Sequence, residues 1–125
     1  MQIETQGQLA SEIMATVHKI MFSAEANQST LLVRSAVRGT SPNQLLSAAI
    51  TRRISGIVKG FLPADPPLSL RCAGLRDRIL QVLEMFDEEE SRIRTHAAES
   101  GSSYIKYVSL GMTMVVTRAL LEESK

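Results

Sequence analysis

The stretch that decides the fold is Gly39-Thr40-Ser41-Pro42-Asn43-Gln44, which separates two helical patterns. Gly39 is suited to end a helix, because glycine adopts the left-handed backbone conformation at no steric cost. Ser41 can accept a hydrogen bond from a free amide, Pro42 suits the first helical position, and Gln44 completes a capping box. We therefore predict a sharp corner, followed by a helix that begins at Pro42.

Apolar residues recur at helical spacing on both sides of this corner. The preceding helix spans Leu31 to Val37 and places Arg34 and Arg38 four residues apart on one face. The following helix ends at Gly60 and turns one apolar face inward, made of Leu45, Leu46, Ala49, Ile50, Ile54, Ile57 and Val58.

The first apolar pattern leaves two interpretations open. Between Gln8 and Ala24, apolar residues fall on one helical stripe, Leu9, Ile13, Val17, Ile20 and Ala24. Residues 17–22 are also rich in strand-favouring side chains, so this part fits a short, half-buried strand. Helix is the first prediction, and a strand at 17–22 is its alternative.

The second half begins with a connector at residues 62–67, where three prolines exclude a continuous helix. If the chain has an internal boundary, we expect it there. A long helix is predicted from Ser69 to Glu99, with pairs Glu88–Arg92 and Glu90–Arg94 in the favourable order. Its inner seam is Cys72, Leu75, Ile79, Val82, Phe86 and Ile93.

The last helix is predicted over Ser103 to Glu122, after a break at residues 100–103 that offers a cap. It carries one apolar stripe of Ile105, Val108, Met112, Val115 and Ala119 and a second one of Tyr107, Leu110, Met114 and Leu121. Because a helix that is apolar on two sides needs two partners, we expect the second stripe to form a homodimer or a higher oligomer.

The composition fits one small helical domain. The chain has 125 residues, 44% hydrophobic and 22% charged, which is average for a folded protein. Aromatic residues reach only 4% while six methionines are present, as suits helices packed on helices. We therefore predict a mainly α, four- to five-helix bundle over residues 1–125.

The cellular location is predicted from the disulfides, targeting segments and membrane spans that the sequence does not encode. One cysteine forms no internal disulfide, and the first residues show neither a basic start nor a long apolar run, so we expect a cytoplasmic protein. No apolar stretch approaches the roughly 18 residues of a membrane helix, so we expect no membrane span.

No pattern for catalysis stands out. His18 and His96 are far apart and belong to no metal-spaced cluster, and Cys72 lies on an inner seam. The acids at 87–90 are consecutive, as on a solvated helix face, whereas catalytic carboxylates need distinct environments. Phosphate-binding glycine loops and nucleophile motifs are missing. We expect no enzyme, no metal and no cofactor.

Residues 31–54 resemble the paired helices of the ribbon-helix-helix family of Arc repressor-like DNA-binding proteins. The resemblance covers about a quarter of the chain and is carried by Gly39, Ser41, Asn43, Leu45, Leu46, Ala49, Ile50 and Ile54. It implies a short strand before the first helix, which pairs with a second subunit and enters the major groove. That strand corresponds to residues 17–22, whose outward residues, Val17, Lys19 and Met21, include none of the usual base readers Arg, Asn and Gln.

These observations favour a small dimeric DNA-binding regulatory or accessory protein. The formal net charge is only +1, but residues before Phe61 hold more Lys and Arg than acids. Amides at the start of the second helix suit a phosphate oxygen. The expected DNA-binding residues are Lys19, Arg34, Arg38, Thr40, Ser41, Asn43, Arg52 and Arg53. The alternative is a helical adaptor or chaperone-like module that binds another protein's amphipathic helix and depends on residues such as Met112 and Met114.

Overall fold

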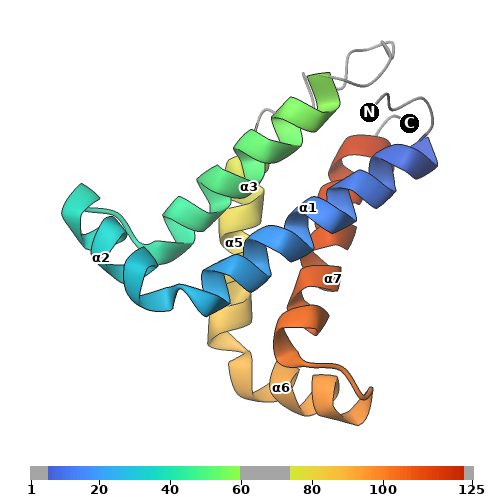
Figure 1. Ribbon diagram of the computed structural model, residues 1–125. Helices are drawn as coiled ribbons and strands as arrows, with labels where there is room; N and C mark the ends of the chain where they lie inside the picture. Colours follow the sequence, from blue (N-terminus) through green and yellow to red (C-terminus); the bar gives the residue numbers. More distant parts are fainter. Residues whose placement is uncertain (1–5, 60–73, 123–125) are drawn as a thin grey trace.

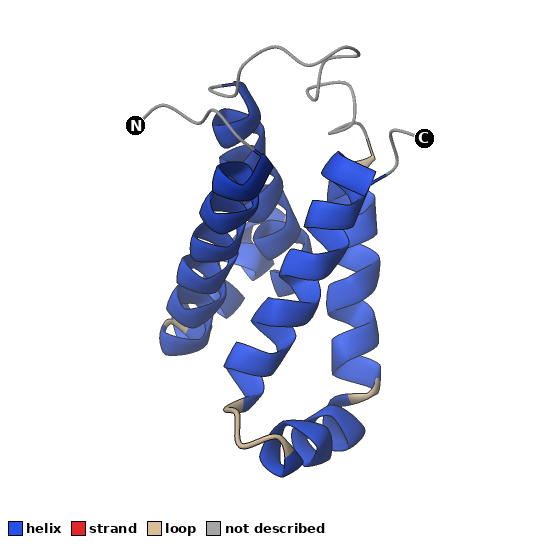
Figure 2. Ribbon diagram, turned by 90° about the vertical axis from the view of Figure 1, so that its right-hand side faces the viewer, coloured by secondary structure: helices blue, strands red, loops and turns tan. Residues whose placement is uncertain are grey.

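The protein is built from helices alone in the part of the chain that the structure describes. This structure is a computed structural model, which describes residues 6–59 and 74–122. Figure 1 shows the order of the helices, and Figure 2 shows only helices and loops among these residues. The elements are α1 (Gln6–Ala26), α2 (Gln28–Arg38), α3 (Pro42–Lys59), α5 (Leu75–Glu88), α6 (Glu90–Glu99), α7 (Tyr104–Thr117) and a π-helical end, η1 (Arg118–Glu122).

The corner between α2 and α3 forms as predicted. Gly39 has a φ of 68°, in the left-handed region, and the amide of Thr40 donates to the carbonyl of Ser35 over 2.9 Å. Ser41 Oγ accepts from the amide of Gln44 over 3.1 Å, and Gln44 Oε1 accepts from the amide of Ser41 over 2.8 Å. The capping box therefore fixes the start of α3.

Residues 17–22 are helical, so the alternative of a strand there is wrong. They lie in the middle of α1, whose buried stripe is Leu9, Ile13, Val17 and Met21. Val17, expected to face outward in a strand, is buried. This stripe packs against α3 and α7, so two helical neighbours cover it and leave no sheet partner.

The long helix predicted to Glu99 is instead two helices, because the chain turns at Glu89. Residues 87–92 are all polar, so a straight continuation would project away from the core. The turn brings Ile93 and Ala97 of α6 back onto α7, where both are buried. The described residues thus form six α-helices, whereas four or five were predicted. The start of the predicted helix at residues 69–73, which includes Cys72, lies outside the described residues.

One cluster of buried apolar side chains connects both halves of the chain. It includes Ile50 and Ile54 of α3, Ile79 of α5 and Met112 and Val116 of α7. Ser103 caps α7 as predicted, accepting from the amide of Lys106 over 3.2 Å. The connector at 62–67 lies outside the described residues. None of the described helices combines the length and apolar character that crossing a membrane requires.

Candidate nucleic-acid interface

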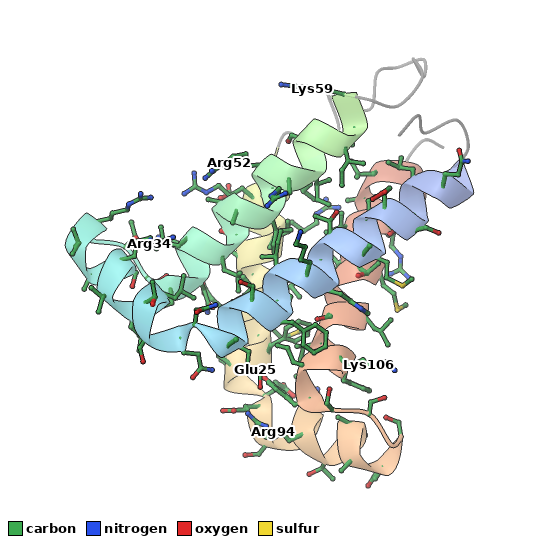
Figure 3. All side chains as sticks on the ribbon, viewed as in Figure 1. Glu25, Arg34, Arg52, Lys59, Arg94 and Lys106 are labelled. Carbon is green, nitrogen blue, oxygen red and sulfur yellow. The ribbon has the colours of Figure 1, made fainter. Side chains whose placement is uncertain are left out.

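A positively charged hollow lies where α1, α2 and α3 meet. It has a volume of about 620 Å³ and is lined by five cations, which we call the basic groove: Lys19, Arg34, Arg38, Arg52 and Arg53. Figure 3 shows Arg34 and Arg52 in the angle between α2 and α3. These five are the charged residues that the sequence predicted to bind DNA, and the fold brings them together.

The local sequence explains this convergence. Arg34 and Arg38 are one helical turn apart on α2, and the glycine corner folds α2 back so that both line the same hollow as Arg52 of α3. Ala48 and Ala49 line the floor of the hollow, and their small side chains leave room between the helices. The groove is therefore a product of the corner and of small residues on α3.

The positive charge of the groove is not balanced locally. No acidic residue lines the hollow, and within residues 6–59 and 74–122 none of its five cations forms an ion pair. Helices α1 to α3 contain only two acids, Glu12 and Glu25. By contrast, Arg94 in the other half is paired with Glu90 over 2.9 Å. Converging like charges repel one another, and an anion bound in the groove relieves that repulsion.

The start of α3 is not the free phosphate site that the sequence suggested. The capping box uses the amides of Ser41 and Gln44. Asn43 points to α5 and donates to Asp87 Oδ2 over 2.6 Å, so a carboxylate already faces this helix start. Thr40 Oγ1 is buried without a hydrogen-bond partner among the described residues. Thr40, Ser41 and Asn43 therefore do not line the basic groove.

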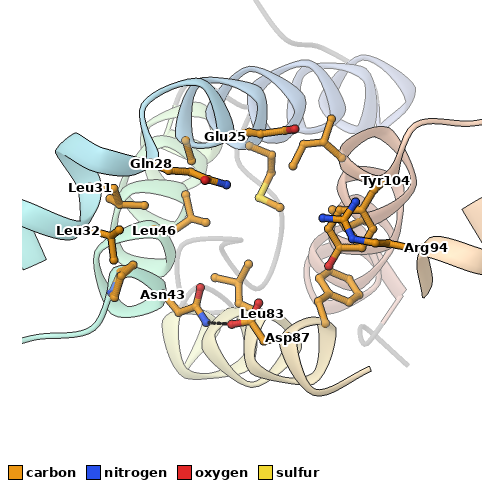
Figure 4. A pocket seen from close by; sticks show the side chains of 16 residues that line it. Glu25, Gln28, Leu31, Leu32, Asn43, Leu46, Leu83, Asp87, Arg94 and Tyr104 are labelled. Atoms are coloured by element: carbon orange, nitrogen blue, oxygen red, sulfur yellow. Dashed lines mark hydrogen bonds between the residues drawn. The ribbon is translucent and has the colours of Figure 1, made fainter. Parts of the chain in front are cut away.

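A second hollow, which sequence reasoning missed, lies on the other side of the junction between α1, α2 and α3. This central cavity has a volume of about 390 Å³ and is lined by side chains from all six described α-helices. Figure 4 shows Glu25, Asn43, Asp87 and Tyr104 around its opening. No sequence signal points to it, because its walls come from segments that lie far apart in the chain.

The two histidines have different surroundings, and the Nε2 of His18 is buried without a hydrogen-bond partner among the described residues. His18 packs edge-on against Phe22, with ring centroids 6.1 Å apart. His96 lies on the surface of α6, where its Nδ1 is 3.7 Å from a carboxylate oxygen of Glu99. In the described residues, no group of three or more His, Cys, Asp or Glu side chains is arranged to hold a metal ion.

Two apolar surfaces are exposed. The stripe that the sequence assigned to an oligomer interface, Tyr107, Leu110 and Met114, faces solvent on α7; the side chain of Leu121 falls outside the described ones. Helix α2 adds a surface that the sequence analysis did not single out. Its Val33 and Val37 are 65% and 82% exposed.

We compared the chain with family models, curated proteins and solved structures, and none of the three comparisons finds a match.

Proposed function

We propose that the protein binds the phosphate backbone of double-stranded DNA in the basic groove and acts as a small regulatory or accessory protein. The observation that carries this proposal is the convergence of five Lys and Arg side chains on one hollow without an acid in its lining. Arginine and lysine are the residues that most often contact DNA phosphates.

The chemistry of the groove suits phosphates better than base edges. A cation that neutralises a phosphate releases a condensed counterion, which favours binding regardless of sequence. Besides its cations, the groove offers few side chains that distinguish bases, with Asn27 as its one amide. Since residues 17–22 are helical, the proposal includes no ribbon in the major groove. We expect weak sequence preference.

We further propose that two copies associate through the exposed stripe on α7. Met114 is 62% exposed and lies on the same side of α7 as the exposed Tyr107 and Leu110, and a contiguous exposed apolar patch marks an interaction site. A two-fold dimer through this helix presents two basic grooves, and two grooves on one duplex strengthen binding through effective concentration.

An electrophoretic mobility shift tests the DNA proposal. A 20-base-pair duplex is titrated with the protein at 50 mM and at 200 mM salt. We expect a shifted complex at 50 mM salt and little complex at 200 mM salt, because phosphate contacts weaken steeply with salt. Absence of a complex at 50 mM salt overturns the proposal.

A second candidate function, a helical adaptor, is favoured by the exposed apolar face of α2. Val33 and Val37 lie one turn apart on it, and such a pair can receive the apolar face of a partner's helix. Of the two methionines that the sequence analysis assigned to this function, Met112 is 0% exposed and cannot contact a partner, whereas Met114 is 62% exposed. The surface on α2 therefore takes the place of Met112 in the adaptor candidate, and Met114 remains accessible on α7.

Salt distinguishes the two functions. Binding of an uncharged amphipathic peptide of Leu, Ala and Gln through α2 changes little with salt, and Val37→Asp abolishes it. Binding of DNA falls with salt and survives Val37→Asp. A fluorescence anisotropy titration with each labelled probe separates these outcomes.

A further inference from the structure

The central cavity has the dimensions of a small-molecule site. Its volume of about 390 Å³ falls in the range of roughly 300–1,000 Å³ typical of ligand pockets. The cavity exists because α2 packs mainly against α3, and because the turn at Glu89 directs α6 onto α7. Neither helix fills the space between α1, α5 and α7. Figure 4 shows side chains arranged as a ring around an open centre.

Most of the wall is apolar. Met21, Leu83 and Val108 are buried, and the half-buried Leu46, Phe86 and Ile105 complete the surface. An apolar group placed against this wall leaves water on that side and contacts both aliphatic and aromatic carbon. Removal of apolar surface from water is the main driving force for such binding.

The charge at the opening is negative. Glu25 and Asp87 both line the cavity, and within the described ranges neither carboxylate pairs with a Lys, Arg or His. Asp87 is held in place by the side-chain amide of Asn43, over 2.6 Å. Arg94 is the cation of the lining, and it is already paired with Glu90 over 2.9 Å.

Tyr104, which also lines the cavity, is a polar group that carries no charge at neutral pH. The guanidinium of Arg94 lies 4.0 Å from the centroid of the Tyr104 ring. Burial, together with the Glu90 carboxylate, raises the pKa of Tyr104 above its usual 10.0, although Arg94 acts in the opposite direction. Tyr104 thus keeps its O–H at neutral pH and adds no negative charge.

We infer that the central cavity binds a small amphipathic cation. Its protonated amine meets the carboxylate of Asp87, while Glu25, across the opening in Figure 4, adds negative potential. The apolar body of the cation packs against Leu83 and Phe86. An anion is excluded by the same carboxylates and is attracted to the basic groove on the other side of Leu31 and Leu46, which line both hollows. The two hollows therefore select ligands of opposite charge.

Isothermal titration calorimetry with three matched probes tests the inference without DNA. The probes 4-phenylbutylamine, 4-phenylbutan-1-ol and 5-phenylpentanoate share one phenylbutyl body and carry a cationic, a neutral and an anionic head group, respectively. We expect the amine to bind about tenfold more tightly than the alcohol, because a charge-assisted hydrogen bond exceeds a neutral one by roughly that factor. The carboxylate is expected to bind most weakly.

Two double variants locate the site. Asp87→Asn with Glu25→Gln removes both carboxylates from exposed positions, and its preference for the amine should fall to about onefold. Glu84→Gln with Glu12→Gln removes the same charge from the same two helices outside the cavity lining and should keep the preference. Circular dichroism verifies that each variant is folded.

Several results overturn the inference. They are equal affinities for the three probes, no binding of any probe at about 1 mM, and an unchanged preference in the Asp87→Asn, Glu25→Gln variant. An equal loss of preference in both double variants also overturns it, because net charge alone then explains the selectivity. Each result leaves the DNA proposal untouched, since that proposal concerns the basic groove.

Discussion

Removing the two cations of α2 should change the salt dependence of DNA binding by an amount that follows from the number of cations in the basic groove. Five cations line the groove, and each phosphate contact contributes about −0.9 to the slope of log K against log salt, so we expect a slope of about −4.5 per protomer. The double variant Arg34→Gln, Arg38→Gln keeps three of the cations, and its slope should be about −2.7. Between 50 mM and 200 mM salt, affinity should thus fall about 500-fold for the unaltered protein and about 40-fold for the variant.

Fluorescence anisotropy of a labelled 20-base-pair duplex at four or more salt concentrations measures both slopes. The matched control is Arg76→Gln, Arg92→Gln, which removes the same charge from exposed positions of α5 and α6 outside the groove. The control should keep the slope of the unaltered protein. Equal slopes for the groove variant and the unaltered protein would refute the assignment of Arg34 and Arg38 to phosphate contacts.

Three further predictions concern stability, titration and assembly. The buried hydroxyl of Ser109 has no hydrogen-bond partner in the described part, whereas the hydroxyl of the equally buried Ser47 donates to a carbonyl. In urea unfolding, the Ser109→Ala variant should therefore be more stable than the Ser47→Ala variant by about 1 kcal/mol. The reverse order of stability contradicts this account. In a Tyr107→Phe variant, Tyr104 is the remaining tyrosine, and ultraviolet absorbance follows its ionisation. The phenol should ionise above pH 10.0 in the folded chain and at lower pH in urea, so its contribution to stability is lost as the pH rises above 10. Identical titration midpoints in the folded and the urea-unfolded chain would exclude the effect of burial. Met114→Glu should convert the proposed dimer to a monomer in light scattering, and a dimeric mass that the substitution leaves unchanged would remove α7 from the interface.

Features set by neighbouring residues could be predicted from the sequence. Gly39, Ser41 and Gln44 encode the corner because their hydrogen bonds span only a few residues. The pair Glu90–Arg94 forms as predicted, for the same reason. Arg92, however, pairs with Glu89 in place of Glu88, because the turn at Glu89 changes the spacing on the helix surface.

Features that depend on tertiary contacts escaped prediction. Helical and strand patterns were both compatible with residues 17–22, and only packing against α3 and α7 decides for helix. The polar run at residues 87–92 does not by itself mark the turn at Glu89, because a solvated helix face has the same composition, and the turn depends on the packing of α6 against α7. For the same reason the sequence identified the cations of the basic groove but not their common hollow, and the central cavity was missed altogether.

The central claim, that DNA lies in the basic groove, is tested most directly by nuclear magnetic resonance of the ¹⁵N-labelled protein during titration with the same duplex. We predict that the amide signals of Thr30, Ala48 and Ala49, which line the groove, shift most, while that of Thr95 on α6 stays in place. Shifts concentrated on α6 and α7, with the groove amides unmoved, contradict the claim.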